Sequence, residues 1–179
     1  MLKLHQALIS FYYHFHHQQH YFLCHDILEE AWKAQPHYSK NDAVVSLILF
    51  ATACYHYRRD NRVGAGKSFS KALKVIEPFD EQDDRLGLDL RSYKKVIQEE
   101  RTRLEQGELF EPIQLPLTTK MEDEIIQVYP EYQFSAEVIT KPYILHHHIE
   151  RDRTEVVRAR QRALQERQQA RVKRPYSNK

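Results

Sequence analysis

Residues 42–58 read DAVVSLILFATACYHYR, and this stretch decides the fold. Apolar residues occupy nearly every helical position in it, so a helix built from it is apolar on all sides. Outside a membrane, such a helix must be packed by neighbours on several sides. The sequence therefore predicts a central helix over 42–58 with other helices around it.

Helical spacing of apolar residues continues on both sides of this central segment. We predict helices over 4–16 and 19–33 before it, and over 66–76 and 86–104 after it, because apolar residues recur there every three or four positions. Short links between successive helices favour antiparallel neighbours. The predicted fold class is all-α, a compact antiparallel bundle of four to five helices.

The pattern changes after Gly107. Pro112 and Pro116 stand among alternating apolar residues, which suits an extended arm, and one or two helical turns are predicted over 121–128. Residues 148–172 are helix-forming but contain few large apolar side chains, which indicates a solvated basic helix. The predicted organisation is a helical bundle domain over 1–106, an extended arm with short irregular elements over 107–145, and a basic C-terminal helix and tail over 146–179.

Length and composition narrow the class of protein. The chain has 179 residues, of which 41% are hydrophobic and 29% are charged, so it is long and apolar enough for one folded domain. No apolar run reaches the roughly 18 residues that a membrane span needs. Cys24 and Cys54 lie within apolar helical patterns and form no CxxC pair, which indicates reduced core residues. We expect a soluble, cytoplasmic protein.

The net charge of +2 hides an asymmetry, because residues 150–179 carry +6 and the rest of the chain carries −4. A basic helix can bind nucleic acid through phosphates or meet an acidic protein face. Membrane binding is disfavoured because the helix has no apolar face to insert. The arginines that define it are Arg151, Arg153, Arg158, Arg160, Arg162, Arg167 and Arg171. Intrahelical Glu–Arg pairs on a solvated helix are the simpler interpretation.

One polar constellation could carry chemistry. Residues 25–32 read HDILEEAW, which places His25 and Glu29 one helical turn apart on the same face. A His and a carboxylate at this spacing can ligate a metal or form an acid–base pair. A divalent metal would need at least one further ligand, for which His56 and Glu30 are the candidates, and Trp32 and Tyr55 would stand beside the site.

The alternative is purely structural, and the spacing alone favours it. His25 would then be a buried polar group that Glu29 satisfies, holding the second helix against the third beside Trp32. No second His completes a zinc-protease motif, because Glu29 occupies that position. No complete catalytic set is present, so neither a cofactor nor an enzymatic reaction is predicted.

The residues 21–32, YFLCHDILEEAW, contain the pattern H-[ED]-x-L-E-x-x-W, and the central helix ends in ACYHYRR over 53–59. This succession resembles a bacterial family known as domain of unknown function number 309, over about residues 15–76. Residues 141–164 resemble the longer versions of that family found in bacilli. The resemblance implies a small helical bundle in which the face of His25, Glu29 and Trp32 packs beside His56, and it implies no reaction.

Three functions follow as hypotheses, in this order. The first is a non-enzymatic interaction or scaffold protein that binds a protein partner, with the arm and the basic helix extending its reach. The second is a metal-binding or small-ligand pocket at His25, Glu29 and His56, with an enzymatic role open. The third is nucleic-acid binding through the basic C-terminal helix.

Overall fold

The structure is a computed structural model that describes residues 3–141, 162, 164–165 and 167–169. Within residues 3–141 the chain forms helices that pack on one another, and no strand is present there. The helices are α1 (Leu4–Tyr13), the π-helix η1 (His14–Gln18), α2 (Tyr21–Lys33), α3 (Ala43–Arg58), α4 (Arg62–Ile76), α5 (Leu90–Glu105) and α6 (Thr119–Val128). The predicted all-α bundle is confirmed.

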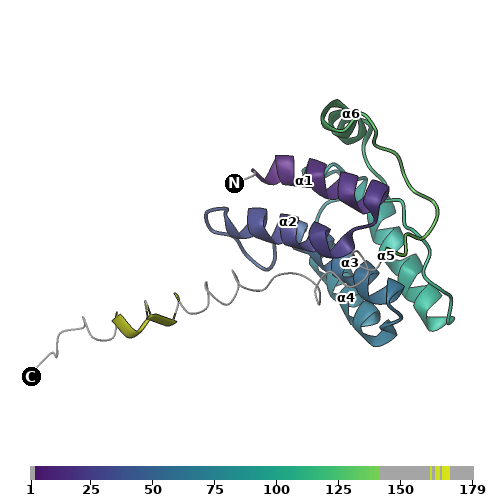
Figure 1. Cartoon of the computed structure of the whole chain (residues 1–179), viewed down its shortest axis with the longest axis horizontal. Coiled ribbons are helices and arrows are strands. Elements are labelled where there is room, and N and C mark those ends of the chain that lie inside the picture. Colours follow the sequence, from purple (N-terminus) through teal and green to yellow (C-terminus); the bar gives the residue numbers. More distant parts are fainter. Residues whose placement is uncertain (1–2, 142–161, 163, 166, 170–179) are drawn as a thin grey trace, which may run out of the picture. The chain divides into compact units, whose positions relative to one another are not determined.

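Helix α3 is the central element, as its all-round apolar sequence predicts. It packs on α2 on one side and on α4 on the other, while α1 packs on α2 and α5 packs on α4 (Figure 1). Buried positions occur all around α3, and Ser46 is the buried polar residue among them. The Ser46 hydroxyl donates to the carbonyl of Ala72 at 2.8 Å and lies 2.8 Å from the Tyr93 hydroxyl, so it is satisfied inside the core.

The core around α3 is rich in aromatic residues. Phe50 lies at its centre, with its ring 5.3 Å from Phe69, 5.7 Å from Tyr93 and 5.9 Å from Phe15. These contacts join η1, α3, α4 and α5 through the side chain of Phe50. Cys24 and Cys54 are fully buried with free thiols, as their apolar surroundings in the sequence predict.

Two helix starts differ from the prediction. Helix α4 begins at Arg62, four residues before the predicted start, because the side chain of Asn61 accepts a hydrogen bond from the Gly64 amide at 3.1 Å and caps the extra turn. Helix α5 begins at Leu90, four residues after the predicted start. Leu88 instead forms an isolated antiparallel bridge with Leu117 of the arm.

The arm is extended at first, as predicted, and is anchored to the bundle. Ile113 and Leu115 are buried, and α6 packs on α1 through the buried Met121 and Ile125. Helix α6 has 10 residues, which is longer than the predicted one or two turns, because the Thr118 side chain caps it by accepting from the Met121 amide at 3.2 Å. The described residues 3–141 belong to one compact unit.

Candidate functional site

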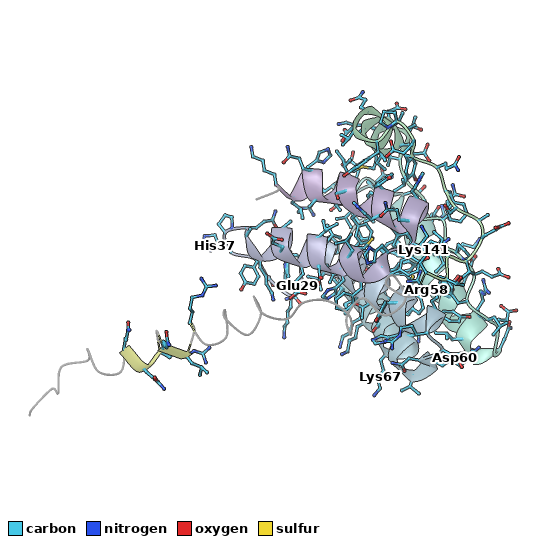
Figure 2. All side chains as sticks on the ribbon, in the orientation of Figure 1. Glu29, His37, Arg58, Asp60, Lys67 and Lys141 are labelled. Atoms are coloured by element: carbon cyan, nitrogen blue, oxygen red, sulfur yellow. The ribbon has the colours of Figure 1, made fainter. Side chains whose placement is uncertain are left out.

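His25 and Glu29 meet on α2 as their spacing requires. The Nε2 atom of His25 lies 3.1 Å from Oε2 of Glu29, and its Nδ1 atom lies 3.3 Å from Oδ1 of Asp26. The other Glu29 oxygen accepts from Lys33 at 2.5 Å. The side chains of His25 and Glu29 are 27% and 32% exposed, and Figure 2 labels Glu29 on the α2 ribbon.

This geometry corrects the buried-pair interpretation. His25 is half-buried rather than buried, and Glu29 is shared with an exposed lysine. A pair of this exposure contributes at most about 1 kcal/mol to stability, so it does not hold α2 against α3. Aromatic rings join the two helices instead: Phe22 lies 5.2 Å from Tyr55, and the Arg58 guanidinium lies 4.6 Å over the Tyr21 ring.

Trp32 lies in the last turn of α2, and its polar contacts are with the segment that leads into α3. Its indole N–H donates to Oδ2 of Asp42 at 3.0 Å and approaches the Ser39 carbonyl at 3.2 Å. The same Asp42 oxygen accepts from the Ser39 amide at 2.8 Å. Trp32 therefore fixes the turn that leads into α3, with the ring of Tyr38 packed against it at 5.1 Å.

The ring of Phe22 connects His25 with Tyr55. Its centroid lies 5.8 Å from that of His25 and 5.2 Å from that of Tyr55. The Nδ1 atom of His56 accepts from the Asn61 amide at 3.1 Å. Burial lowers the pKa of His56 and the nearby Arg59 lowers it further, so the ring is neutral at pH 7.

No metal centre is assembled in the described part of the chain. Among these residues no three His, Cys, Asp or Glu side chains are grouped as a metal ion would require. His25 and Glu29 come together, and His56 does not join them as a third ligand. The metal site at His25, Glu29 and His56 remains a hypothesis of the sequence.

A groove between α3 and α4 is the feature that the sequence did not reveal. Its volume is about 620 Å³. Among the described residues that line it, five are apolar, three are lysines and one is an asparagine. They are Lys40, Asn41, Val45, Leu49, Lys71, Lys74, Val75, Pro78 and Phe79. The groove therefore combines an apolar floor with a positively charged rim.

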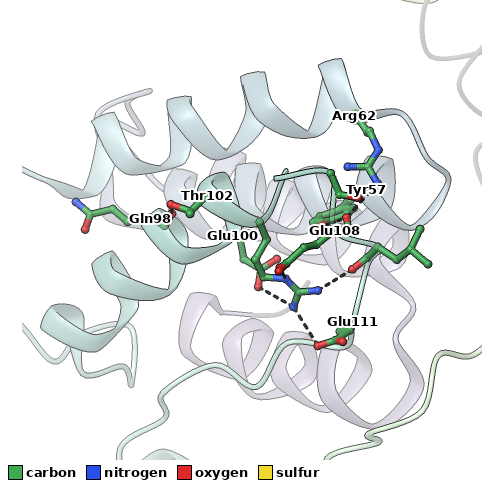
Figure 3. Close-up of polar contacts among 10 residues, drawn as sticks. Tyr57, Arg62, Gln98, Glu100, Thr102, Glu108 and Glu111 are labelled. Atoms are coloured by element: carbon green, nitrogen blue, oxygen red, sulfur yellow. Dashed lines mark hydrogen bonds and ion pairs between the residues drawn. The ribbon is translucent and has the colours of Figure 1, made fainter. Parts of the chain in front are cut away.

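A charged cluster at the end of α5 was also not predicted. The Arg103 guanidinium lies 3.0 Å from Glu108, 3.1 Å from Glu111 and 4.0 Å from Glu100, and donates to the Leu109 carbonyl at 2.7 Å (Figure 3). Glu100 is buried, and burial raises its pKa to about 7. The cluster holds the loop after α5 against the bundle.

A second unpredicted site attaches the arm to η1. The Leu115 amide donates to Nε2 of His16 at 2.8 Å, so the other ring nitrogen carries the proton and donates to the Tyr132 hydroxyl at 2.7 Å. Burial lowers the pKa of His16 to about 3. The Gln19 amide donates to the Glu137 carbonyl at 2.6 Å and accepts from the Ile139 amide at 2.9 Å.

The C-terminal basic segment falls almost entirely outside the described residues. Arg162 and Arg167 are described, and both are helical and exposed. Arg151, Arg153, Arg158, Arg160 and Arg171 lie outside the described residues. Nucleic-acid binding through this segment stays a prediction of the sequence.

Comparison with known proteins supports the family resemblance that the His25-to-Trp32 motif predicts. Residues 8–67 match the family described as "Domain of unknown function (DUF309)". The matched residues contain the His25-to-Trp32 motif on which the resemblance rests. It is also similar to the uncharacterised protein YpuF of Bacillus subtilis (strain 168), with 29% identity over 172 residues that cover 93% of this chain and 98% of that protein. No solved structure matches the chain. No helix in the described ranges is both long and apolar enough to cross a membrane.

Proposed function

We propose that the protein is a non-enzymatic interaction protein and that a partner protein docks in the groove between α3 and α4. The apolar floor of this groove, rimmed by lysines, carries the proposal. Val45, Leu49 and Val75 are only half-buried on the folded chain. Apolar surface of this kind with a polar rim is typical of sites that bind another molecule.

The charge of the rim selects the partner. Lys40, Lys71 and Lys74 are all exposed, so their ammonium groups are available to a docked segment. Complementary charge steers association and rejects partners of like charge. The partner segment is therefore acidic and carries apolar side chains that fill the floor.

The shape of the groove favours a helical partner segment. Val45 and Leu49 lie one turn apart on α3, and Lys71 and Val75 lie one turn apart on α4, so the groove follows each of the two helices for about one turn. Docking of an amphipathic helix into an apolar groove between helices is a recurring mode of protein recognition.

Photo-crosslinking in cells of the source organism tests this function. A photoreactive phenylalanine derivative replaces Lys74 in the full-length chain, and a matched control carries it at Lys95, which is exposed on α5. The expected result is an adduct from position 74 that position 95 does not give. Sequencing of the crosslinked partner peptide should show acidic and apolar residues.

Reversing the charge of two groove lysines tests whether the adduct at position 74 comes from docking in the groove or from chance proximity. Lys40→Glu and Lys71→Glu together should abolish the adduct at position 74 while leaving the melting temperature within a few degrees, because exposed substitutions usually change stability by about 0.5 kcal/mol or less. An adduct that survives the reversal, or identical adducts from positions 74 and 95, would refute the proposed function.

A further inference from the structure

Helix α6 has the chemistry that the groove would bind. Its buried residues face α1, while Glu122 and Asp123 are exposed to solvent. Two large aliphatic side chains of its last turn are also exposed, Ile126 at 48% and Val128 at 58%. A helix that leaves both carboxylates and aliphatic side chains in water presents an unpartnered surface.

We propose that α6 of a second copy of this chain docks in the α3–α4 groove, so that the protein associates with itself head to tail. The proposal rests on the proposed function, since it uses the same groove. Glu122 and Asp123 would face Lys71 and Lys74, and Ile126 would enter the apolar floor. Self-association then competes with the partner protein for one site, and this competition regulates partner binding.

Helix α6 and the groove are placed so that they can meet only between two copies of the chain. Helix α6 packs on α1, whereas the groove is lined by residues of α3 and α4. Figure 1 shows α6 on the far side of α1 from α3 and α4. A copy therefore cannot place α6 in its own groove without undocking it from α1. Because the two surfaces differ, the interface is heterologous and builds chains or rings rather than one symmetric dimer.

The basic segment 150–179 is the other part of this chain that could occupy the groove, and its charge argues against it. Residues 150–179 carry a net charge of +6, the same sign as the groove rim. Bringing like charges together across an interface is unfavourable. The acidic and aliphatic surface of α6 has the opposite sign and fits the rim.

The contact is expected to be weak and sensitive to salt. Helix α6 has only 10 residues, so one docked copy buries less surface than a stable interface of roughly 1,600 Å². The charged groups lie at the surface, where salt at about 0.15 M screens interactions beyond roughly 8 Å. Self-association should therefore increase with protein concentration and decrease with salt.

Sedimentation velocity on purified full-length protein tests the proposal through a pair of charge reversals. The groove variant carries Lys71→Glu and Lys74→Glu, and the helix variant carries Glu122→Lys and Asp123→Lys. A control variant with Arg91→Glu and Lys95→Glu makes the same charge change on the exposed side of α5. Circular dichroism melting confirms that each variant is folded.

The expected result is concentration-dependent association of the wild type and the control at low salt. Each of the groove and helix variants alone should associate about tenfold more weakly, as is typical when charge pairs across an interface are broken. An equimolar mixture of the two variants should recover association, since each then offers a helix and a groove of opposite charge.

A wild type that stays monomeric at low salt up to about 1 mM, the weak end of specific association, would overturn the proposal. Equal association of all four proteins, or no recovery in the mixture, would overturn it as well. Failure of self-association leaves the proposed function standing if charge reversal still abolishes the adduct at position 74. If self-association fails and the adduct also survives the charge reversal, docking in the groove itself is refuted.

Discussion

At the scale of single residues, Glu100 is an acid whose burial opposes its ionisation. Its pKa in the folded chain is raised to about 7 from 4.5 in the unfolded chain. The folded state therefore holds a proton between pH 4.5 and 7 that the unfolded state releases, so this group favours folding less as the pH rises through that window. Glu100→Gln should raise the free energy of unfolding at pH 8 by roughly 1–3 kcal/mol.

Urea unfolding at pH 8 and at pH 4 measures this effect, with Glu99→Gln as the control on the exposed side of the same helix. The gain should shrink at pH 4, where Glu100 is protonated in the folded state and largely protonated in the unfolded one. Equal effects of the two substitutions at pH 8 would show that Glu100 is ionised without penalty.

The hydrogen bond from His16 to Tyr132 fixes the arm through a single hydroxyl. Tyr132→Phe leaves the buried N–H of His16 without this acceptor, so the free energy of unfolding should fall by about 1–3 kcal/mol. Tyr129→Phe keeps the ring that stacks on Tyr13 at 4.0 Å and serves as the control. Denaturant unfolding compares the two, and a loss no larger at position 132 than at position 129 would contradict the role of this bond.

The sequence predicts contacts between residues only where they are local. The four-residue spacing of His25 and Glu29 on one helix sets their separation, and the structure places them 3.1 Å apart. His16 contacts Leu115 and Tyr132, which are 99 and 116 residues away, and helical periodicity carries no information about such pairs. The exposure of His25 was missed for the same reason, since it depends on which helices cover α2.

At the scale of elements, α4 contains two glycines with different surroundings. A Cβ atom at Gly66 would meet nothing within 4 Å, whereas one at Gly64 would lie 2.6 Å from Nδ2 of the capping Asn61. Alanine is favoured over glycine inside a helix by about 1 kcal/mol. Gly66→Ala should therefore stabilise the protein by up to about that amount, and Gly64→Ala should gain less or lose stability because it displaces the cap.

Thermal unfolding of the two single variants and of Asn61→Ala tests this account of the helix start. If the cap is the reason, Gly64→Ala in the Asn61→Ala background should recover the gain seen at Gly66. An equal gain at both glycines in the wild-type background would mean that Asn61 adds nothing to the start of α4.

Helix boundaries were the least predictable feature of the elements. The predicted start at 86 followed the apolar spacing of Leu86 and Leu90, but Leu86 and Leu88 are buried in the link before α5. The Thr118 amide donates to the Gly87 carbonyl at 2.8 Å and the Asp89 amide donates to the Pro116 carbonyl at 2.9 Å, so the arm takes the hydrogen bonds that a helix would have used. Apolar spacing alone cannot distinguish these two kinds of burial.

At the scale of the whole molecule, the central helix was enough to predict the bundle. An all-round apolar segment must be covered, and the short links around it leave few ways to cover it. The groove could not be predicted in this way, because Val45 and Leu49 of α3 resemble core positions in the sequence. They are left half-buried only because α4 ends at Ile76, and Pro78 and Phe79 then turn the chain beside them.

The buried titratable groups predict a stability maximum near neutral pH. Burial lowers the pKa of His16 to about 3, and it also lowers the pKa values of His14 and His56. The unfolded chain takes up protons on these rings below pH 6.5, whereas the folded chain takes them up only at lower pH, so stability falls as the pH falls through that range. Glu100 acts in the opposite sense, since its stability gain appears as the pH falls through 7.

Below pH 6.5 the three histidines together change the free energy of unfolding more than Glu100 does. Between about pH 6.5 and 8, Glu100 alone changes it. The free energy of unfolding should therefore rise from pH 8 to a maximum between about pH 6 and 7 and then decline toward pH 4. Urea unfolding across this range measures the profile. Glu100→Gln should flatten the limb above pH 6.5 and steepen the decline between pH 6.5 and 4.5, because Glu100 no longer opposes the histidines there. A wild-type stability that still increases from pH 7 to pH 8 would contradict the burial of Glu100 as the source of the upper limb.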